Sequence, residues 1–163
     1  MPSEKSLDKD RRKPDHYRVV ARREEVAACL NPLCSILLVE DHYDTQQAFA
    51  AILRSWGHEV ATSSSAATAL QVLDEREVDV VVSDIGLPDR NGYELVAEAR
   101  LRHPALATIA VSAYFTVADH DRGSDAGFDM FFSKPVDLVA LRHVLERTPV
   151  GHNGKSGAAQ TVS

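Results

Sequence analysis

The chain has 163 residues, of which 44% are hydrophobic and 26% are charged. These proportions are ordinary for a globular protein, and the length suits one domain with tails better than two full domains. The net charge of −6 argues against a protein that binds nucleic acid over its surface, and no apolar run approaches the ~18–20 residues that a membrane span needs.

The first 34 residues are expected to form an arm outside the main domain. Residues 1–16 are polar and charged and contain proline, a composition typical of a disordered segment. Residues 17–30 could form one amphipathic helix, which Asn31 and Pro32 would end.

The two cysteines of the chain, Cys29 and Cys34, lie in this arm. Two cysteines five positions apart provide neither a disulfide framework nor a zinc ligand set, so we interpret them as free thiols of a reducing compartment. The N-terminus also lacks an apolar stretch like that of a signal peptide. We therefore expect a cytoplasmic protein.

From Ser35 onward, short apolar runs alternate with helical patterns. Strands are predicted at residues 36–39, 58–62, 78–83, 108–112 and 128–133. Apolar residues three and four positions apart predict helices at 49–56, 66–73, 95–99, 117–126 and 138–145, of which the fourth is weakened by Gly123. The pattern predicts an α/β domain over residues 35–148, with a doubly wound parallel sheet and helices on both faces. Residues 149–163 are expected to be a flexible tail.

Polar residues stand where several of these strands end, and in parallel sheets the functional site lies at that edge. They are Glu40, Asp41, Asp84, Ser112 and Lys134, and the apolar residues Ala113 and Pro135 follow the last two. Carboxylates held close together either take up protons or recruit a cation, since two charges ~4 Å apart repel by about 4 kcal/mol at an effective dielectric of 20. Oxygen ligands favour Mg²⁺, which also binds phosphates, and an aspartate can act as a nucleophile toward phosphorus. The sequence therefore predicts phosphate chemistry at this edge.

Four segments resemble the motifs of the response-regulator receiver family, in the family's order and spacing. They are residues 36–41 (ILLVED), 83–93 (SDIGLPDRNGY), 111–113 (VSA) and 132–135 (FSKP). The resemblance covers residues 35–148 and implies a five-stranded flavodoxin-like sheet in the order 2-1-3-4-5. It also implies that Asp84 is the phosphoacceptor. Glu40, Asp41, Asp84 and the backbone carbonyl of Gly86 would hold Mg²⁺.

The resemblance further implies which residues bind the phosphoryl group and respond to it. Ser112, Ala113 and Lys134 would contact the group, Phe131 would change rotamer on activation, and Lys134 would precede a cis-proline at Pro135. Serine stands at position 112 where threonine is commoner in the family. Phenylalanine at position 131 offers no phenol hydroxyl, which puts in doubt any partner contact that needs one.

We accordingly expect a stand-alone receiver that takes its phosphoryl group from a histidine kinase or a phosphotransfer protein. It would signal to a protein target through the face of the fourth helix, fifth strand and fifth helix. The chain would be a stoichiometric phosphoacceptor that assists its own phosphorylation and dephosphorylation, not an enzyme. We expect no direct contact with DNA or membrane, and activation could drive formation of a homodimer.

Two alternatives remain open. A pseudo-receiver would keep the fold as a binding module without phosphorylation, although the acceptor, the acidic pair and the lysine are all present. A phosphatase of the haloacid-dehalogenase type also uses an aspartate nucleophile and Mg²⁺. It requires Asp-x-Asp after the first strand, whereas Asp41 and Asp44 are three positions apart.

Overall fold

A computed structural model describes residues 17–19, 33–113 and 116–148. Its five parallel strands are β2 (Ser35–Val39), β3 (Glu59–Ser63), β4 (Val80–Asp84), β5 (Ala107–Ser112) and β6 (Met130–Ser133). They are hydrogen-bonded in the order β3-β2-β4-β5-β6, which is the predicted order 2-1-3-4-5. The predicted fold class is therefore confirmed.

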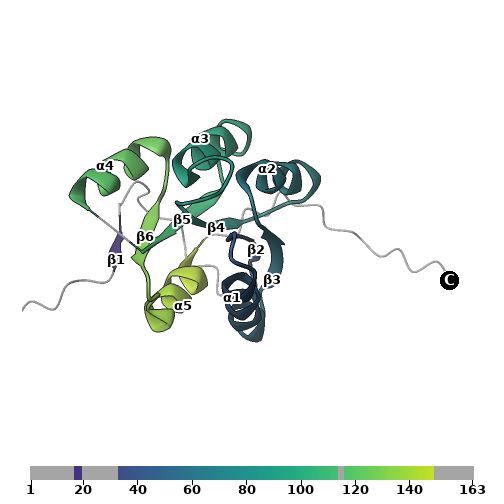
Figure 1. Ribbon diagram of the computed structural model, residues 1–163. Coiled ribbons are helices and arrows are strands. Elements are labelled where there is room, and N and C mark those ends of the chain that lie inside the picture. Colours follow the sequence, from purple (N-terminus) through teal and green to yellow (C-terminus); the bar gives the residue numbers. More distant parts are fainter. Residues whose placement is uncertain (1–16, 20–32, 114–115, 149–163) are drawn as a thin grey trace, which may run out of the picture.

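Helices cover both faces of this sheet (Figure 1). Helices α1 (Tyr43–Ser55) and α5 (Leu138–Arg147) lie on one face, and α2 (Ala66–Glu75), α3 (Gly92–Arg102) and α4 (Val117–Ala126) lie on the other. Side chains just before the helices accept hydrogen bonds from free backbone amides of the first turn, as Asn91 does for α3 and Asp137 for α5.

The strand sequences fill two cores because successive side chains point to opposite faces of a sheet. In β2, Ile36 and Leu38 are buried against α1 and α5, whereas Leu37 and Val39 are buried in the core that includes α2 and α3. A strand covered on both faces has no polar side, which explains the continuous apolar runs of the sequence.

A sixth strand that the sequence pattern does not predict lies at the edge of the sheet. Strand β1 (Tyr17–Val19) pairs antiparallel with β6, in a register that sets Tyr17 opposite Phe132. Residues 17–30 were expected to form a helix, so the structure differs from that expectation at its start. Tyrosine and valine both favour strands, and the outer edge of a sheet is where a further strand can add its backbone hydrogen bonds. Residues 20–30 lie outside the described part of the chain.

Candidate functional site

Lys134 joins two acidic residues from different strands at the carboxyl edge of the sheet. Its Nζ lies 2.9 Å from Glu40 Oε2 and 2.7 Å from Asp84 Oδ2. Glu40 is only 3% exposed, so the ammonium compensates a carboxylate that is almost removed from water. Burial opposes the charged form of Lys134, but the hydrogen bonds and charges of Asp84 and Glu40 outweigh it and raise the pKa of the lysine.

A second acidic group lies beside this trio. Glu40, Asp41 and His42 each offer one ligand atom within 4.8 Å of the others. His42 Nδ1 is 3.1 Å from Asp41 Oδ1, and the backbone N–H of His42 donates to Glu40 Oε1. Slight burial opposes ionisation of Asp41, but the hydrogen bond and charge of His42 outweigh it and lower the pKa of Asp41. No role for His42 could be predicted from the sequence, because it has no metal-binding spacing with the other histidines.

The loop after β4 holds the Asp84 side chain from the other side. The backbone N–H of Gly86 donates a hydrogen bond of 3.0 Å to Asp84 Oδ1. Helix α3 begins directly against this turn, and a Cβ on Gly92 would lie 2.7 Å from the backbone oxygen of Asp84. Only glycine permits that close approach, so the turn formers of the sequence motif serve to place the Asp84 carboxylate.

Asp89 ties the same loop to helix α2, a role that the sequence did not reveal. Its two carboxylate oxygens accept hydrogen bonds of 2.9 and 2.8 Å from the backbone N–H groups of Ala66 and Ala67. These hydrogen bonds lower the pKa of Asp89. The only sequence signal was a carboxylate in a turn, and such a side chain usually accepts hydrogen bonds from backbone amides of its own turn.

The predicted switch residues lie in or directly after β5 and β6. Ser112 is half-buried at the end of β5, its backbone oxygen accepts from the N–H of Lys134, and Ala113 follows it at the surface. Phe131 is only 2% exposed and packs on Phe128, with ring centroids 5.7 Å apart. The Lys134–Pro135 peptide bond is cis, the isomer that the resemblance implies.

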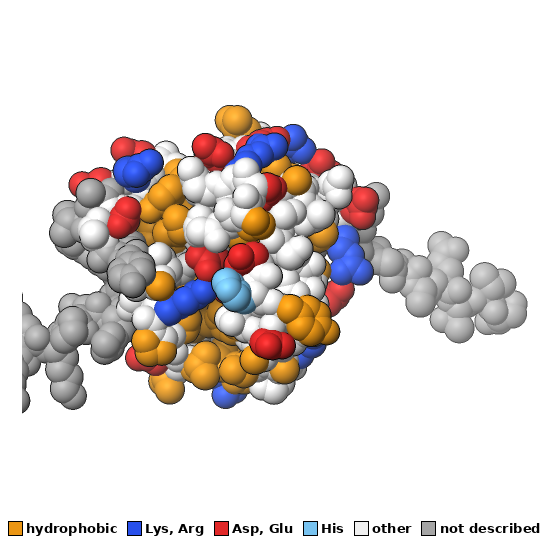
Figure 2. Space-filling view, in the orientation of Figure 1, with side chains coloured by type: hydrophobic (Ala, Val, Ile, Leu, Met, Phe, Trp, Pro, Cys, Tyr) orange, Lys and Arg blue, Asp and Glu red, His pale blue; other side chains and the backbone are white. Residues whose placement is uncertain are grey.

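The donor set at this edge suits a hard divalent cation. Glu40, Asp41 and Asp84 offer carboxylate oxygens against the one ammonium of Lys134, so the cluster keeps a net negative charge. Oxygen ligands of this kind are those that Mg²⁺ takes in phosphate-binding sites. Figure 2 shows acidic side chains gathered beside a basic one near the centre of this face.

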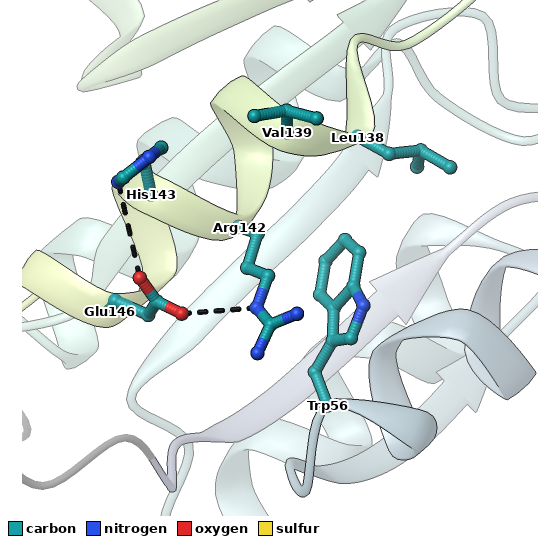
Figure 3. Close-up of a pocket in the computed structure, with 6 residues that line it drawn as sticks. All are labelled: Trp56, Leu138, Val139, Arg142, His143 and Glu146. Atoms are coloured by element: carbon teal, nitrogen blue, oxygen red, sulfur yellow. Dashed lines mark hydrogen bonds and ion pairs between the residues drawn. The ribbon is translucent and has the colours of Figure 1, made fainter.

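A hollow of about 410 Å³ between α1 and α5 lies apart from these residues. Its lining residues are Trp56, Leu138, Val139, Arg142, His143 and Glu146, none of which is a predicted site residue (Figure 3). The Arg142 guanidinium lies 5.7 Å from the centre of the Trp56 ring, and its Nε donates to Glu146.

Comparison of the sequence with models of known protein families identifies the family of this chain. Residues 36–146 match the model of the response regulator receiver domain. This chain belongs to the response-regulator receiver family. The family prediction is therefore confirmed, and the receiver domain is a module of two-component signalling that interacts with histidine kinases and phosphotransfer proteins.

Receiver segments of larger proteins are among its relatives. The chain is 34% identical over 110 residues to the sensor histidine kinase RcsC of Salmonella typhi, and 32% identical over 111 residues to the transcriptional regulatory protein GlrR of Escherichia coli. Each match covers 68% of this chain but only 12% of the kinase and 25% of the regulator. The receiver therefore spans a small part of these relatives.

Solved receiver structures share the fold. A CheY-like receiver domain protein from Methanospirillum hungatei superposes with a TM-score of 0.66 at 28% identity, over 71% of this chain and 96% of that one. The chemotaxis protein CheY4 of Vibrio cholerae gives 0.68 at 23% identity, over 72% and 99% of the two chains. The latter likeness shows the fold alone. None of the receiver's described helices has the length and apolar character needed to cross a membrane.

Proposed function

We propose that this receiver accepts a phosphoryl group on Asp84 from the phosphohistidine of a histidine kinase or phosphotransfer protein. The observation that carries the proposal is the position of the Asp84 carboxylate. It lies at the carboxyl end of β4, 17% exposed, with Lys134 Nζ at 2.7 Å and the buried Glu40 on the far side of the same ammonium. An ordinary surface carboxylate at position 84 would not require a lysine that is hydrogen-bonded to it and to the buried Glu40 at the same time.

The chemistry follows from these contacts. A carboxylate oxygen of Asp84 forms a bond to phosphorus while the bond between phosphorus and the donor imidazole breaks, and the imidazole leaves with the electron pair. Lys134 Nζ, already beside the acceptor, then neutralises charge on the transferred oxygens. Bound Mg²⁺ would stabilise the same charge, held by Glu40, Asp41, Asp84 and the carbonyl of Gly86.

The signal would leave the site through the adjacent strand ends. Ser112 would turn its hydroxyl toward the phosphoryl group, and Ala113 and Phe131 would adjust with it. The face made by α4, β6 and α5 would then present a different surface to a protein target or to a second copy of the chain. In this proposal the protein acts in the cytoplasm as a stoichiometric phosphoacceptor, which is phosphorylated once and then dephosphorylated before it can act again.

Incubation with Mg²⁺ and acetyl phosphate, followed by intact mass measurement, tests the proposal. We expect the wild type to gain one phosphoryl group that is stable in acid and labile in base, and Asp84→Asn to gain none. Asp125→Asn, which changes an exposed carboxylate of α4, is the matched control and should behave as wild type. A wild type that gains no group and does not respond to beryllofluoride would be a pseudo-receiver. Sustained turnover of a phosphate ester would instead indicate the phosphatase.

A further inference from the structure

His42 brings a nitrogen donor to the edge where the acidic side chains gather. It directly precedes α1, and its Nδ1 lies 3.1 Å from Asp41 Oδ1 and 3.6 Å from Glu40 Oε1. The His42 side chain is 79% exposed, so its ring can turn toward an ion without leaving a packed core. An ion bound beside these residues would therefore meet an imidazole as well as carboxylates.

The separation of these donor atoms suits two neighbouring ligands of one ion. Zn²⁺, for example, holds imidazole nitrogen and carboxylate oxygen at ~2.0–2.2 Å. Two such ligands are then ~3.0 Å apart at a right angle and ~3.4 Å apart at a tetrahedral angle. The 3.1 Å between His42 Nδ1 and Asp41 Oδ1 lies between these values. The same distance also fits a plain hydrogen bond, so the two arrangements must be separated by experiment.

Asp41 is the carboxylate best placed to share an ion with His42. Both oxygens of Glu40 are already engaged, because Oε2 accepts from Lys134 Nζ and Oε1 accepts from the backbone N–H of His42. The side chain of Glu40 is also only 4% exposed, whereas that of Asp41 is 30% exposed. An ion arriving from solvent therefore meets Asp41 and His42 first.

The kind of donor decides which ions a site favours. Mg²⁺ is bound through oxygen and keeps several of its waters. Imidazole instead suits transition ions, whose affinity for nitrogen-containing sites rises from Mn²⁺ through Co²⁺ and Ni²⁺ to Cu²⁺. A nitrogen ligand at this edge would therefore act on one class of ion and spare the other.

We propose that His42 Nδ1 is an additional ligand of the cation site, and that it raises the affinity of the site for transition ions while leaving that for Mg²⁺ almost unchanged. This role rests on the cation site of the function proposed above, and it adds the class of ion that the site favours.

Calorimetric titration of the full chain with Ni²⁺ and with Mg²⁺ tests the role of His42. His42→Gln keeps an oxygen donor but removes the nitrogen, so Ni²⁺ affinity should fall about tenfold or more and Mg²⁺ affinity should change less than about twofold. His143→Gln is the matched control, because His143 is 74% exposed and its Nδ1 lies 4.0 Å from a carboxylate oxygen of Glu146. The control should bind both ions as the wild type does, and Asp41→Asn should weaken the binding of both.

Pulsed electron paramagnetic resonance of bound Mn²⁺ shows whether the nitrogen touches the ion. A directly bound imidazole nitrogen couples magnetically to the Mn²⁺ electrons, whereas a histidine that only orients Asp41 gives no such coupling. The wild type and His143→Gln should show the nitrogen coupling, and His42→Gln should lack it.

Three results would overturn the role of His42. The first is a nitrogen coupling that is missing from the wild type or persists in His42→Gln. The second is an equal loss of Ni²⁺ and Mg²⁺ affinity in His42→Gln, which would show that His42 acts only through its hydrogen bond to Asp41. The third is Ni²⁺ binding that Asp41→Asn does not weaken, which would place the ion elsewhere.

Intact mass after addition of acetyl phosphate separates this role from the proposed function. An adduct on Asp84 without nitrogen coupling to Mn²⁺ would leave the proposed function standing and remove the role of His42. Ni²⁺ binding that depends on both Asp41 and His42, without any adduct, would keep the role of His42 and contradict the proposed function.

Discussion

The Nζ of Lys134 lies 2.7 Å from Oδ2 of Asp84, although the two residues are 50 positions apart and their strands are separated by β5. The lysine must therefore reach across the end of an intervening strand. In the free receiver this ammonium already occupies the place from which it can meet a phosphoryl group on Asp84.

Replacement of Lys134 by methionine should affect cation binding and acceptor chemistry in opposite directions. Without the ammonium, the carboxylates of Glu40 and Asp84 repel each other unscreened, so Mg²⁺ affinity should rise about three- to tenfold. Formation of the acetyl phosphate adduct should slow, because no cation from the chain meets the transferred oxygens. Calorimetric Mg²⁺ titration and intact mass measure the two effects, with Lys134→Arg as the charge-preserving control. Weaker Mg²⁺ binding by the methionine variant would contradict this reading.

Asp89→Ala should loosen the loop that carries Gly86. Loss of its two hydrogen bonds leaves the first amides of α2 without that partner, which should lower the free energy of unfolding by about 1 kcal/mol. Mg²⁺ affinity should fall as well, since the Gly86 carbonyl loses its fixed position. Urea unfolding and Mg²⁺ titration check both, beside Asp125→Ala as a control of equal charge change. Equal stability and equal Mg²⁺ affinity of the two variants would show that the hydrogen bonds of Asp89 to α2 do not hold the loop in place.

The histidine at position 58 should make the domain less stable in mild acid. Burial, more than the charge of Arg142, lowers the pKa of His58 below its ordinary value of 6.5, and its Nδ1 accepts a hydrogen bond from the N–H of Cys34. The neutral ring is therefore favoured by folding. Its contribution to stability is present above pH 6.5 and is lost as the pH falls through the lower pKa of the folded state.

Urea unfolding from pH 7.5 down to pH 5 measures this effect. His58→Gln keeps an acceptor for Cys34 but cannot take up the proton, so its stability should fall less over this range than that of the wild type. His143→Gln, at an exposed position of α5, should follow the wild type. Parallel curves for the wild type and His58→Gln would show that His58 does not titrate in this way.

Ser112→Ala should separate phosphorylation from its consequence. The alanine variant keeps Asp84 and Lys134 and should still form the adduct. A hydrogen bond to a charged oxygen is worth about 1.5–3 kcal/mol, so loss of the hydroxyl should reduce the shift toward the active state by roughly ten- to a hundredfold. Hydrogen exchange of α4 with and without beryllofluoride measures the shift. Ser112→Thr should respond as wild type, and a full response in Ser112→Ala would exclude a switching role.

The sequence predicted the parallel sheet and the edge at which Glu40, Asp84 and Lys134 meet. It could do so because buried parallel strands are continuous apolar runs, and because a residue that follows such a strand must lie at its carboxyl edge. The contacts that side chains make with other helices and strands could not be predicted from these two rules. The hydrogen bonds of Asp89 to α2 join residues more than 20 positions apart that no local pattern relates.

Helix α4, whose sequence signal was weak, and strand β1, which was not predicted, show the same limit of prediction from one sequence. Gly123 reduced the helical signal of residues 117–126, yet the helix forms, and the glycine leaves room for the Phe131 ring that packs against it. Strand β1 was missed because three residues carry little periodicity, and its partner β6 is over a hundred positions away. The glycine in α4 and the pairing of β1 both depend on the element that each one contacts. A single sequence does not reveal those contacts.

Chemical location of the phosphoryl group tests the central claim most directly. Borohydride reduces an acyl phosphate to an alcohol, so a receiver phosphorylated on Asp84 should carry homoserine at that position when its peptides are sequenced by mass spectrometry. Phosphotransfer from a phosphohistidine donor in Mg²⁺, followed by this trapping, should give homoserine at position 84 and at no other carboxylate. Homoserine at Asp41, hydroxynorvaline (the corresponding alcohol of glutamate) at Glu40, or a stable phosphate on a hydroxyl residue with Asp84 unchanged, would contradict the account.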